Sequence, residues 1–84
     1  MEYWVYILQS EKDGGYYIGY TADLEERLKR HNERRSRYSR NKTPWKLIYQ
    51  EGFSTRTEAI KREGEIKRMK SREYIERLVS ASPS

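Results

Sequence analysis

A guanidinium and an imidazole fall on the apolar side of the helix predicted over residues 22–33. At about 100° per residue, Leu24 and Leu28 define an apolar stripe. His31 lies inside this stripe and Arg27 lies at its edge. The two are one turn apart, so their side chains can contact the same small ligand. An inward histidine is often a satisfied core residue and an arginine at the edge often reaches water, so that alternative stays open.

A single carboxylate falls among the apolar residues of the second predicted helix, residues 55–70. Ala59, Ile60 and Ile66 define the apolar side, and Glu63 lies among them. An unpaired buried carboxylate is costly and stays ionised only beside a cation or strong donors. Glu63 is therefore either a ligand of a metal ion or part of an internal ion pair with Arg27 or a neighbouring lysine.

Two phenols are predicted to project from one face of a hairpin near the N-terminus. Tyr6 and Tyr17 share a face if residues 13–14 form a two-residue turn, and also if Tyr6 lies directly opposite Tyr17. Gly19 lies on the same face and is expected to leave an open patch beside them. Packing is the usual role of tyrosines in strands, but both hydroxyls must find partners or water.

Positive charge is concentrated in one segment of the chain. From Lys29 to Lys46 there are eight basic residues and one acid, Glu33, in a protein of net charge +5. Such a segment attracts polyanions. Tyr38 and Trp45 offer stacking surfaces, which favours nucleic acid over the alternative of a solubilising loop. The residues expected to contact nucleic acid are Arg34, Arg35, Arg37, Arg40, Lys42 and Lys46.

The elements that must position these side chains follow from periodicity and turn signals. Three segments rich in aromatic and β-branched residues predict strands. Three segments with helical periodicity predict helices, with Thr21, Thr55 and Ser71 as their N-caps. The order β-β-α-β-α-α predicts an α+β domain, in which a small three-stranded sheet, antiparallel or mixed, is flanked by helices. We expect one domain over residues 1–79 and a disordered tail over residues 80–84. The predicted strands are residues 3–9, 16–20 and 45–50, and the predicted helices are residues 22–33, 55–70 and 72–79.

Composition excludes several classes of protein. A chain of 84 residues has room for one domain. It contains no cysteine, which excludes disulfides and thiolate metal sites and makes a reducing cytoplasm the expected location. The N-terminus has no signal-peptide pattern, and no apolar run approaches the roughly 20 residues that cross a bilayer, so no membrane partner is expected.

The spacing of these residues resembles that of the GIY-YIG nuclease family. Residues 4–6 (WVY) and, ten residues later, residues 17–19 (YIG) resemble the paired motif, with Trp and Val in place of the first Gly and Ile. Residues 19–28 resemble the family's passage from strand to helix, and residues 58–67 resemble its second-helix motif. Residues 44–49 resemble the third strand of its small, single-domain bacterial members. The resemblance covers residues 3 to 79.

The resemblance implies a catalytic site. Glu63 would be the one protein ligand of a single Mg²⁺ or Mn²⁺ ion, and Arg27 would hold the phosphate. Tyr6 would take a proton from water with Tyr17 orienting water or phosphate, or His31 would carry the proton instead. The implied catalytic residues are Tyr6, Tyr17, Arg27, His31 and Glu63, with Gly19 as a structural residue of the motif.

The implied function is metal-dependent endonucleolytic cleavage of nucleic acid, with DNA as the expected substrate. Relatives in repair, restriction and homing gain specificity from an attached domain, so a protein partner could supply specificity here. Many members carry an asparagine near the end of the domain, but residues 78–83 contain none, and its role is not transferred to Ser80 or Ser82. The alternative is a nucleic-acid-binding module of the same fold with weak or no catalysis. The sequence indicates neither the oligomeric state nor the choice between DNA and RNA.

Overall fold

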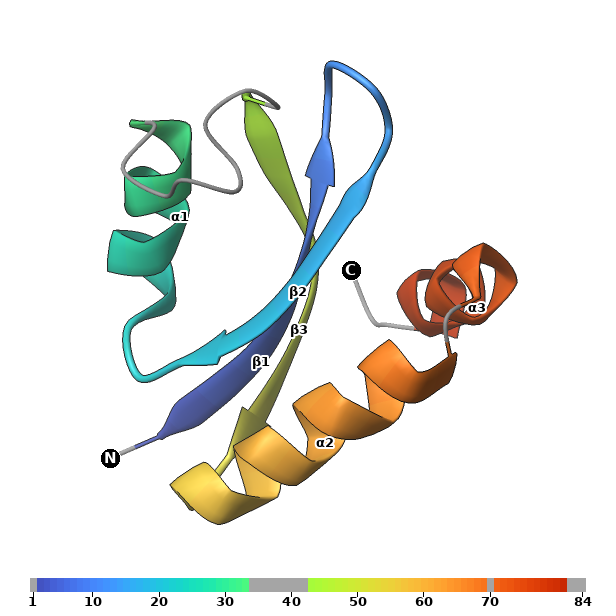
Figure 1. Cartoon of the computed structure of the whole chain (residues 1–84). Helices are drawn as coiled ribbons and strands as arrows, with labels where there is room; N and C mark the ends of the chain where they lie inside the picture. Colours follow the sequence, from blue (N-terminus) through green and yellow to red (C-terminus); the bar gives the residue numbers. More distant parts are fainter. Residues whose placement is uncertain (1, 34–42, 70, 82–84) are drawn as a thin grey trace.

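The computed structural model describes residues 2–33, 43–69 and 71–81, which form a three-stranded sheet with helices on both faces (Figure 1). The predicted order β-β-α-β-α-α and the α+β class are confirmed. None of the described helices is both long and apolar enough to span a bilayer. The strands are β1 (Tyr3–Ser10), β2 (Tyr16–Thr21) and β3 (Trp45–Phe53), and the helices are α1 (Leu24–Asn32), α2 (Arg56–Met69) and α3 (Arg72–Ala81).

The sheet is antiparallel, with β1 between β2 and β3. Residues 5–8 of β1 are almost fully buried because both faces of this central strand are covered. One core, which includes Val5 and Ile7, lies between the sheet and helices α2 and α3. The other core, which includes Tyr6 and Leu8, lies between the sheet and α1. Alternate residues of β1 therefore face two different cores.

A bulge in β3 sets which of its residues face α1. The β1–β3 register shifts between Ile7 and Leu8, and Ile48 is the extra residue. Because side chains alternate along a strand, the shift turns the first part of β3 so that Trp45 and Leu47 pack in the α1 core. The wall behind the two phenols depends on this bulge, which the sequence analysis did not predict.

The β1–β2 register differs from both of the predicted pairings. Tyr6 lies opposite Gly19 instead of Tyr17. The turn is longer than two residues because the Ser10 hydroxyl accepts hydrogen bonds from two backbone N–H groups within residues 11–14. The observed register still places Tyr6, Tyr17 and Gly19 on one face, because the change is by an even number of residues.

The N-cap of α1 is Asp23, and the prediction of Thr21 was wrong. Asp23 Oδ1 accepts a hydrogen bond from the Glu26 backbone N–H at 3.1 Å. Thr21 pairs with Trp4 as the last residue of β2 and is too early in the chain to cap the helix. Its Oγ1 instead accepts from the Asp23 N–H at 3.1 Å, which shapes the passage from strand to helix.

The other two helices begin at the predicted caps. Thr55 Oγ1 accepts a hydrogen bond from the Glu58 N–H, and Ser71 Oγ accepts one from the Tyr74 N–H, each at 3.2 Å. Helix α3 continues through Ser80 and Ala81, which were predicted to belong to the tail. The remainder of the predicted tail lies outside the described residues.

Candidate active site

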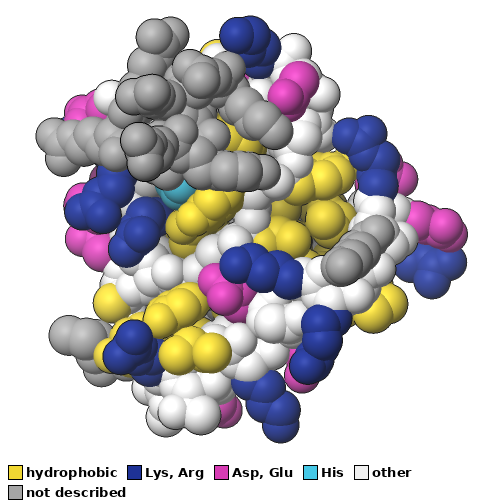
Figure 2. Space-filling view, viewed as in Figure 1, with side chains coloured by type: hydrophobic (Ala, Val, Ile, Leu, Met, Phe, Trp, Pro, Cys, Tyr) yellow, Lys and Arg dark blue, Asp and Glu magenta, His cyan; other side chains and the backbone are white. Residues whose placement is uncertain are grey.

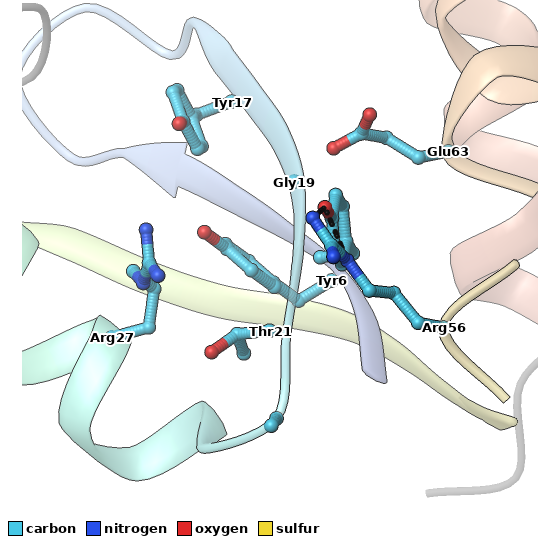
Figure 3. Close-up of a pocket in the computed structure, with 9 residues that line it drawn as sticks. Tyr6, Tyr17, Gly19, Thr21, Arg27, Arg56 and Glu63 are labelled. Carbon is cyan, nitrogen blue, oxygen red and sulfur yellow. Dashed lines mark hydrogen bonds between the residues drawn. The ribbon is translucent and has the colours of Figure 1, made fainter. Parts of the chain in front are cut away.

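An open pocket of about 350 Å³ lies at the exposed edge of β2 (Figure 3). Tyr6, Tyr17 and Arg27 line it from the α1 face of the sheet, and Arg56 and Glu63 reach it from α2 on the other face. The structure therefore brings four of the five predicted catalytic residues to one pocket, and His31 is the exception. The lining residues are Tyr6, Tyr17, Gly19, Tyr20, Thr21, Ala22, Arg27, Arg56 and Glu63.

Gly19 allows the two phenols to approach the backbone of β2. A Cβ atom at Gly19 would lie 2.7 Å from Tyr6 Oη and 3.1 Å from Tyr17 Cε1, which is too close for an unshifted ring. The expected open patch beside Gly19 is therefore occupied by the Tyr6 ring. The Tyr6 and Tyr17 rings stack at a centroid distance of 6.2 Å, so two hydroxyl-bearing rings lie together at the pocket.

His31 lies behind the phenols and does not line the pocket. It is 2% exposed, its Nε2 lies 3.5 Å from Tyr6 Oη, and its ring centroid lies 4.5 Å from that of Tyr17. Burial, followed by the positive charges of Arg27 and Arg30, lowers the pKa of His31 below its ordinary value of 6.5. The imidazole is thus neutral at pH 7 and can accept a proton at one nitrogen.

The Tyr6 hydroxyl keeps its proton in the protein without a bound ligand. Burial and the neighbouring Tyr17 raise the pKa of Tyr6 above its ordinary value of 10, and the nearby Arg27 only partly opposes this rise. A phenolate at this position therefore needs additional positive charge or a proton acceptor. Behind the pocket, the Tyr6 hydroxyl lies 3.5 Å from His31 Nε2, which is an acceptor in one of the two neutral tautomers.

Arg27 presents an unsatisfied donor. Its Nε is buried and has no hydrogen-bond partner among residues 2–33, 43–69 and 71–81. A buried N–H without a partner is unfavourable, so the position suits an incoming acceptor such as a phosphate oxygen. Helix α1 holds Arg27 beside Tyr6 in the pocket (Figure 3).

Glu63 is the carboxylate among the described lining residues of this pocket. Its side chain is 18% exposed and lies 3.6 Å from the ammonium of Lys67, which is 54% exposed. Such a surface pair is weak and leaves most of the acceptor capacity of the carboxylate available. The buried residues Ala59 and Ile66 flank Glu63 on α2, as the helical periodicity predicted.

The donor set fits an ion that prefers oxygen ligands, such as Mg²⁺ or Mn²⁺, more closely than a metal that prefers nitrogen or sulfur ligands. In the described part of the chain, no group of three or more His, Cys, Asp or Glu side chains is placed to hold a metal ion. Mg²⁺ keeps several of its own waters and is commonly held by one or two carboxylates together with substrate phosphates. Glu63 and Arg27, whose Nε is unsatisfied, line the same pocket and match that pattern.

The sequence analysis missed Arg56 and Tyr20 as pocket residues. Arg56 donates two hydrogen bonds to Tyr20 Oη, from Nε at 3.2 Å and from Nη2 at 3.1 Å (dashed in Figure 3). Arg56 precedes Glu63 by seven residues, which is two helical turns, so the two side chains leave the same side of α2. That spacing could have identified Arg56, but the segment was interpreted only as a helix cap.

Most of the predicted nucleic-acid-binding residues lie outside the described residues: Arg34, Arg35, Arg37, Arg40 and Lys42. Lys46 is exposed on β3, opposite Gln9. The flanks of this segment are joined, because the Asn32 side chain accepts from the Trp45 N–H at 2.6 Å and donates to its carbonyl at 3.2 Å.

The described residues carry an almost balanced charge. All 13 acids lie within them, whereas six of the 18 Lys and Arg residues do not. On the face shown in Figure 2, basic side chains are interspersed with acidic ones. Ion pairs between described residues include Arg30–Glu26 and Arg77–Glu73. The excess positive charge of the protein therefore comes from residues 34–42 and Lys70.

Comparison with known proteins gives the family of this domain. The model of the GIY-YIG catalytic domain matches residues 2–75, and the chain belongs to this family. The resemblance noted from the motifs is thereby confirmed.

Relatives named UPF0213 proteins match over most of this chain. One from Staphylococcus saprophyticus is 41% identical over 80 residues, which cover 94% of this chain and 95% of the relative. Another from Streptococcus pneumoniae is 44% identical over 68 residues, covering 80% of this chain and 68% of the relative. The solution NMR structure of a UPF0213 protein from Bacillus halodurans is similar with a TM-score of 0.61 at 38% identity, covering 95% of this chain and 84% of that chain.

Proposed function

We propose that this protein is a divalent-metal-dependent endonuclease that hydrolyses phosphodiester bonds in nucleic acid, with DNA as the expected substrate. The observation that carries the proposal is the convergence of Glu63, the unsatisfied Nε of Arg27 and two phenols on one pocket. The reaction needs a metal ligand, a hydrogen-bond donor to the phosphate, and groups that orient and deprotonate water, and these residues supply all of them. Membership of the GIY-YIG family supports the same chemistry.

In this mechanism the phosphate lies between Arg27 and Glu63. Arg27 donates from Nε to a non-bridging oxygen, a role that suits its planar, permanently charged guanidinium. A Mg²⁺ or Mn²⁺ ion held by Glu63 would supply stabilisation of negative charge on the phosphate and on the departing oxygen. Tyr17 orients the attacking water from its place beside Tyr6.

Tyr6 and His31 act together in proton transfer. The sequence left open which of them is the base, and the raised pKa of Tyr6 argues against a free phenolate. Tyr6 Oη receives the proton of the attacking water while its own proton moves to His31 Nε2, which lies 3.5 Å away. This transfer requires the neutral imidazole with its proton on Nδ1, and the lowered pKa of His31 favours the neutral form.

Cleavage by matched carboxylate variants tests the metal assignment. Wild-type protein, Glu63→Ala and Glu76→Ala are incubated with supercoiled DNA, branched DNA and RNA in Mg²⁺, Mn²⁺ or EDTA. Glu76 is an exposed acid of α3 and controls for the loss of one negative charge. We expect metal-dependent cleavage by wild type and Glu76→Ala and none by Glu63→Ala.

Two other results would lead elsewhere. Equal cleavage by Glu63→Ala and wild type would show that the metal assignment is wrong. Binding without cleavage under every metal condition would favour the alternative of a nucleic-acid-binding module, which the absence of an asparagine from residues 78–83 also favours.

A further inference from the structure

Arg56 places a second positive charge in the pocket, on the side opposite Arg27 (Figure 3). Arg27 reaches the pocket from the α1 face of the sheet, and Arg56 reaches it from the α2 face. The edge of β2 lies between them at Gly19, where the Tyr6 ring fills the space that a side chain would take. Two guanidinium groups therefore lie on opposite sides of this edge of the sheet.

Tyr20 holds the Arg56 guanidinium in place. Arg56 Nε and Nη2 both donate to Tyr20 Oη, and the guanidinium carbon lies 5.9 Å from the centre of the Tyr20 ring. A guanidinium has five N–H donors, so these contacts use two and leave three for an anion. A side chain restrained in this way loses little freedom when it binds a ligand.

Helix stability does not explain the position of Arg56. It is the first residue of α2, where the helix dipole disfavours a cation. The acid in the first turn, Glu58, bonds to Thr55 instead of Arg56. The described hydrogen bonds of the Arg56 guanidinium go to Tyr20, and they hold its charge at the pocket.

We propose that Arg56, positioned by Tyr20, binds a phosphate that flanks the scissile phosphate on the same strand, so that the nucleic-acid backbone crosses the edge of β2 at Gly19. The inference rests on the proposed function, because it takes the pocket to be the site of nucleic acid. Arg27 and Arg56 reach the pocket from opposite faces of the sheet. That arrangement suits contacts to two phosphates of one strand better than two contacts to one phosphate.

Binding without metal tests the contact independently of cleavage. The affinity of the full-length protein for a fluorescein-labelled single-stranded DNA is measured in EDTA over a range of salt concentrations. For Arg56→Ala we expect roughly tenfold weaker binding at low salt. We also expect the slope of log affinity against log salt to become shallower by about 0.7, the value for one phosphate of a single strand.

Arg68→Ala is the matched control, because it removes the same charge from an exposed position of α2 on the side opposite Ala59. Its salt slope should stay at the wild-type value. Arg56→Lys should keep part of the salt slope but bind more weakly than wild type, because an ammonium lacks the planar, paired donors of a guanidinium. Tyr20→Phe should lower affinity while retaining the charge. Melting temperatures of all variants separate a loss of binding from a loss of folding.

A phosphate-by-phosphate comparison locates the contact. Oligonucleotides with one phosphate at a time replaced by an uncharged methylphosphonate are bound to wild type and to Arg56→Ala in EDTA. We expect one replacement that weakens wild-type binding but leaves Arg56→Ala binding unchanged, which is the sign of a direct pair. The same replacement should still weaken binding by Arg68→Ala.

The failure of this inference and that of the proposed function give different results. If Arg56→Ala shows the altered slope and the missing phosphate effect but wild type never cuts in Mg²⁺ or Mn²⁺, the phosphate contact stands and the nuclease proposal fails. If wild type cuts but Arg56→Ala matches Arg68→Ala in slope and phosphate profile, the inference is overturned. Absence of DNA binding by wild type in EDTA would also overturn it.

Discussion

Among the individual residues, His31 departs most from its predicted place. Periodicity put it on the buried side of α1, and it is buried there, but against the backs of Tyr6 and Tyr17 instead of at the pocket surface. An inward histidine was expected to be either a core residue or a functional one. In this position it can be both, because its ring packs in the α1 core while its Nε2 addresses the Tyr6 hydroxyl.

The buried His31 makes a testable prediction about pH. Its folded pKa is lower than the ordinary value of 6.5, so the unfolded chain binds a proton more readily near that pH. The contribution of His31 is therefore fully favourable above about pH 6.5, and the free energy of unfolding falls as pH drops through 6.5 towards the folded pKa. Urea unfolding between pH 7.5 and 5.5 measures this change.

The single histidine of the sequence allows a direct check. An NMR titration of the imidazole signals reports its pKa in the folded protein without ambiguity of assignment. We expect a midpoint below 6.5 and a wild-type loss of stability that is steeper than that of His31→Gln. A midpoint at or above 6.5 would contradict the environment described for this side chain.

At the scale of the elements, replacement of glycine by alanine should have opposite effects on stability in β2 and in α2. An alanine Cβ at Gly19 in β2 would meet the buried Tyr6 ring, whereas one at Gly64 in α2 would meet no atom within 4 Å. Gly19→Ala should destabilise the protein by about 1–3 kcal/mol through overpacking and should lower cleavage by displacing Tyr6. Gly64→Ala should stabilise it by about 0.5–1 kcal/mol because glycine disfavours a helix.

Chemical unfolding and cleavage assays on both variants check this pair. The pattern to expect is a destabilised, impaired Gly19→Ala beside a stabilised, fully active Gly64→Ala. If Gly19→Ala retains both wild-type stability and wild-type cleavage, the close approach of Tyr6 to β2 does not matter for either property.

The elements also show what could be predicted from the sequence and why. Helical periodicity located Arg27 and Glu63 correctly, because a period of 3.6 residues fixes which side chains share a face. The common face of Tyr6 and Tyr17 was predicted for a similar reason, since a change of register by an even number of residues keeps strand faces unchanged.

Features that depend on single hydrogen bonds were not predictable in this way. The hairpin register follows from Ser10 accepting bonds from the loop, and the cap of α1 depends on whether Thr21 is still paired in the sheet. The bulge at Ile48 leaves no periodic signal in so short a strand. Arg56 was missed because its segment was interpreted only as a helix cap, and its hydrogen bond to Tyr20, 36 residues away in the sequence, leaves no local signal.

At the scale of the whole molecule, the sheet separates two cores, and the pocket draws on both sides of it. Tyr6, Tyr17 and Arg27 belong to the α1 side, whereas Arg56 and Glu63 belong to α2. They meet at β2 because it is an edge strand of the sheet and carries a glycine at that point. The site therefore depends on how both helices pack on one small sheet, and it cannot be assigned to either helix alone.

The central claim is that Glu63 and Arg27 serve one metal-assisted phosphate site, and a crystal structure with Mn²⁺ and a phosphate-containing oligonucleotide tests it most directly. The anomalous signal of manganese should lie beside the Glu63 carboxylate, with a phosphate oxygen accepting a hydrogen bond from Arg27 Nε. A metal bound away from Glu63, or a phosphate that leaves Arg27 Nε unpaired while Glu63 stays with Lys67, would contradict the account.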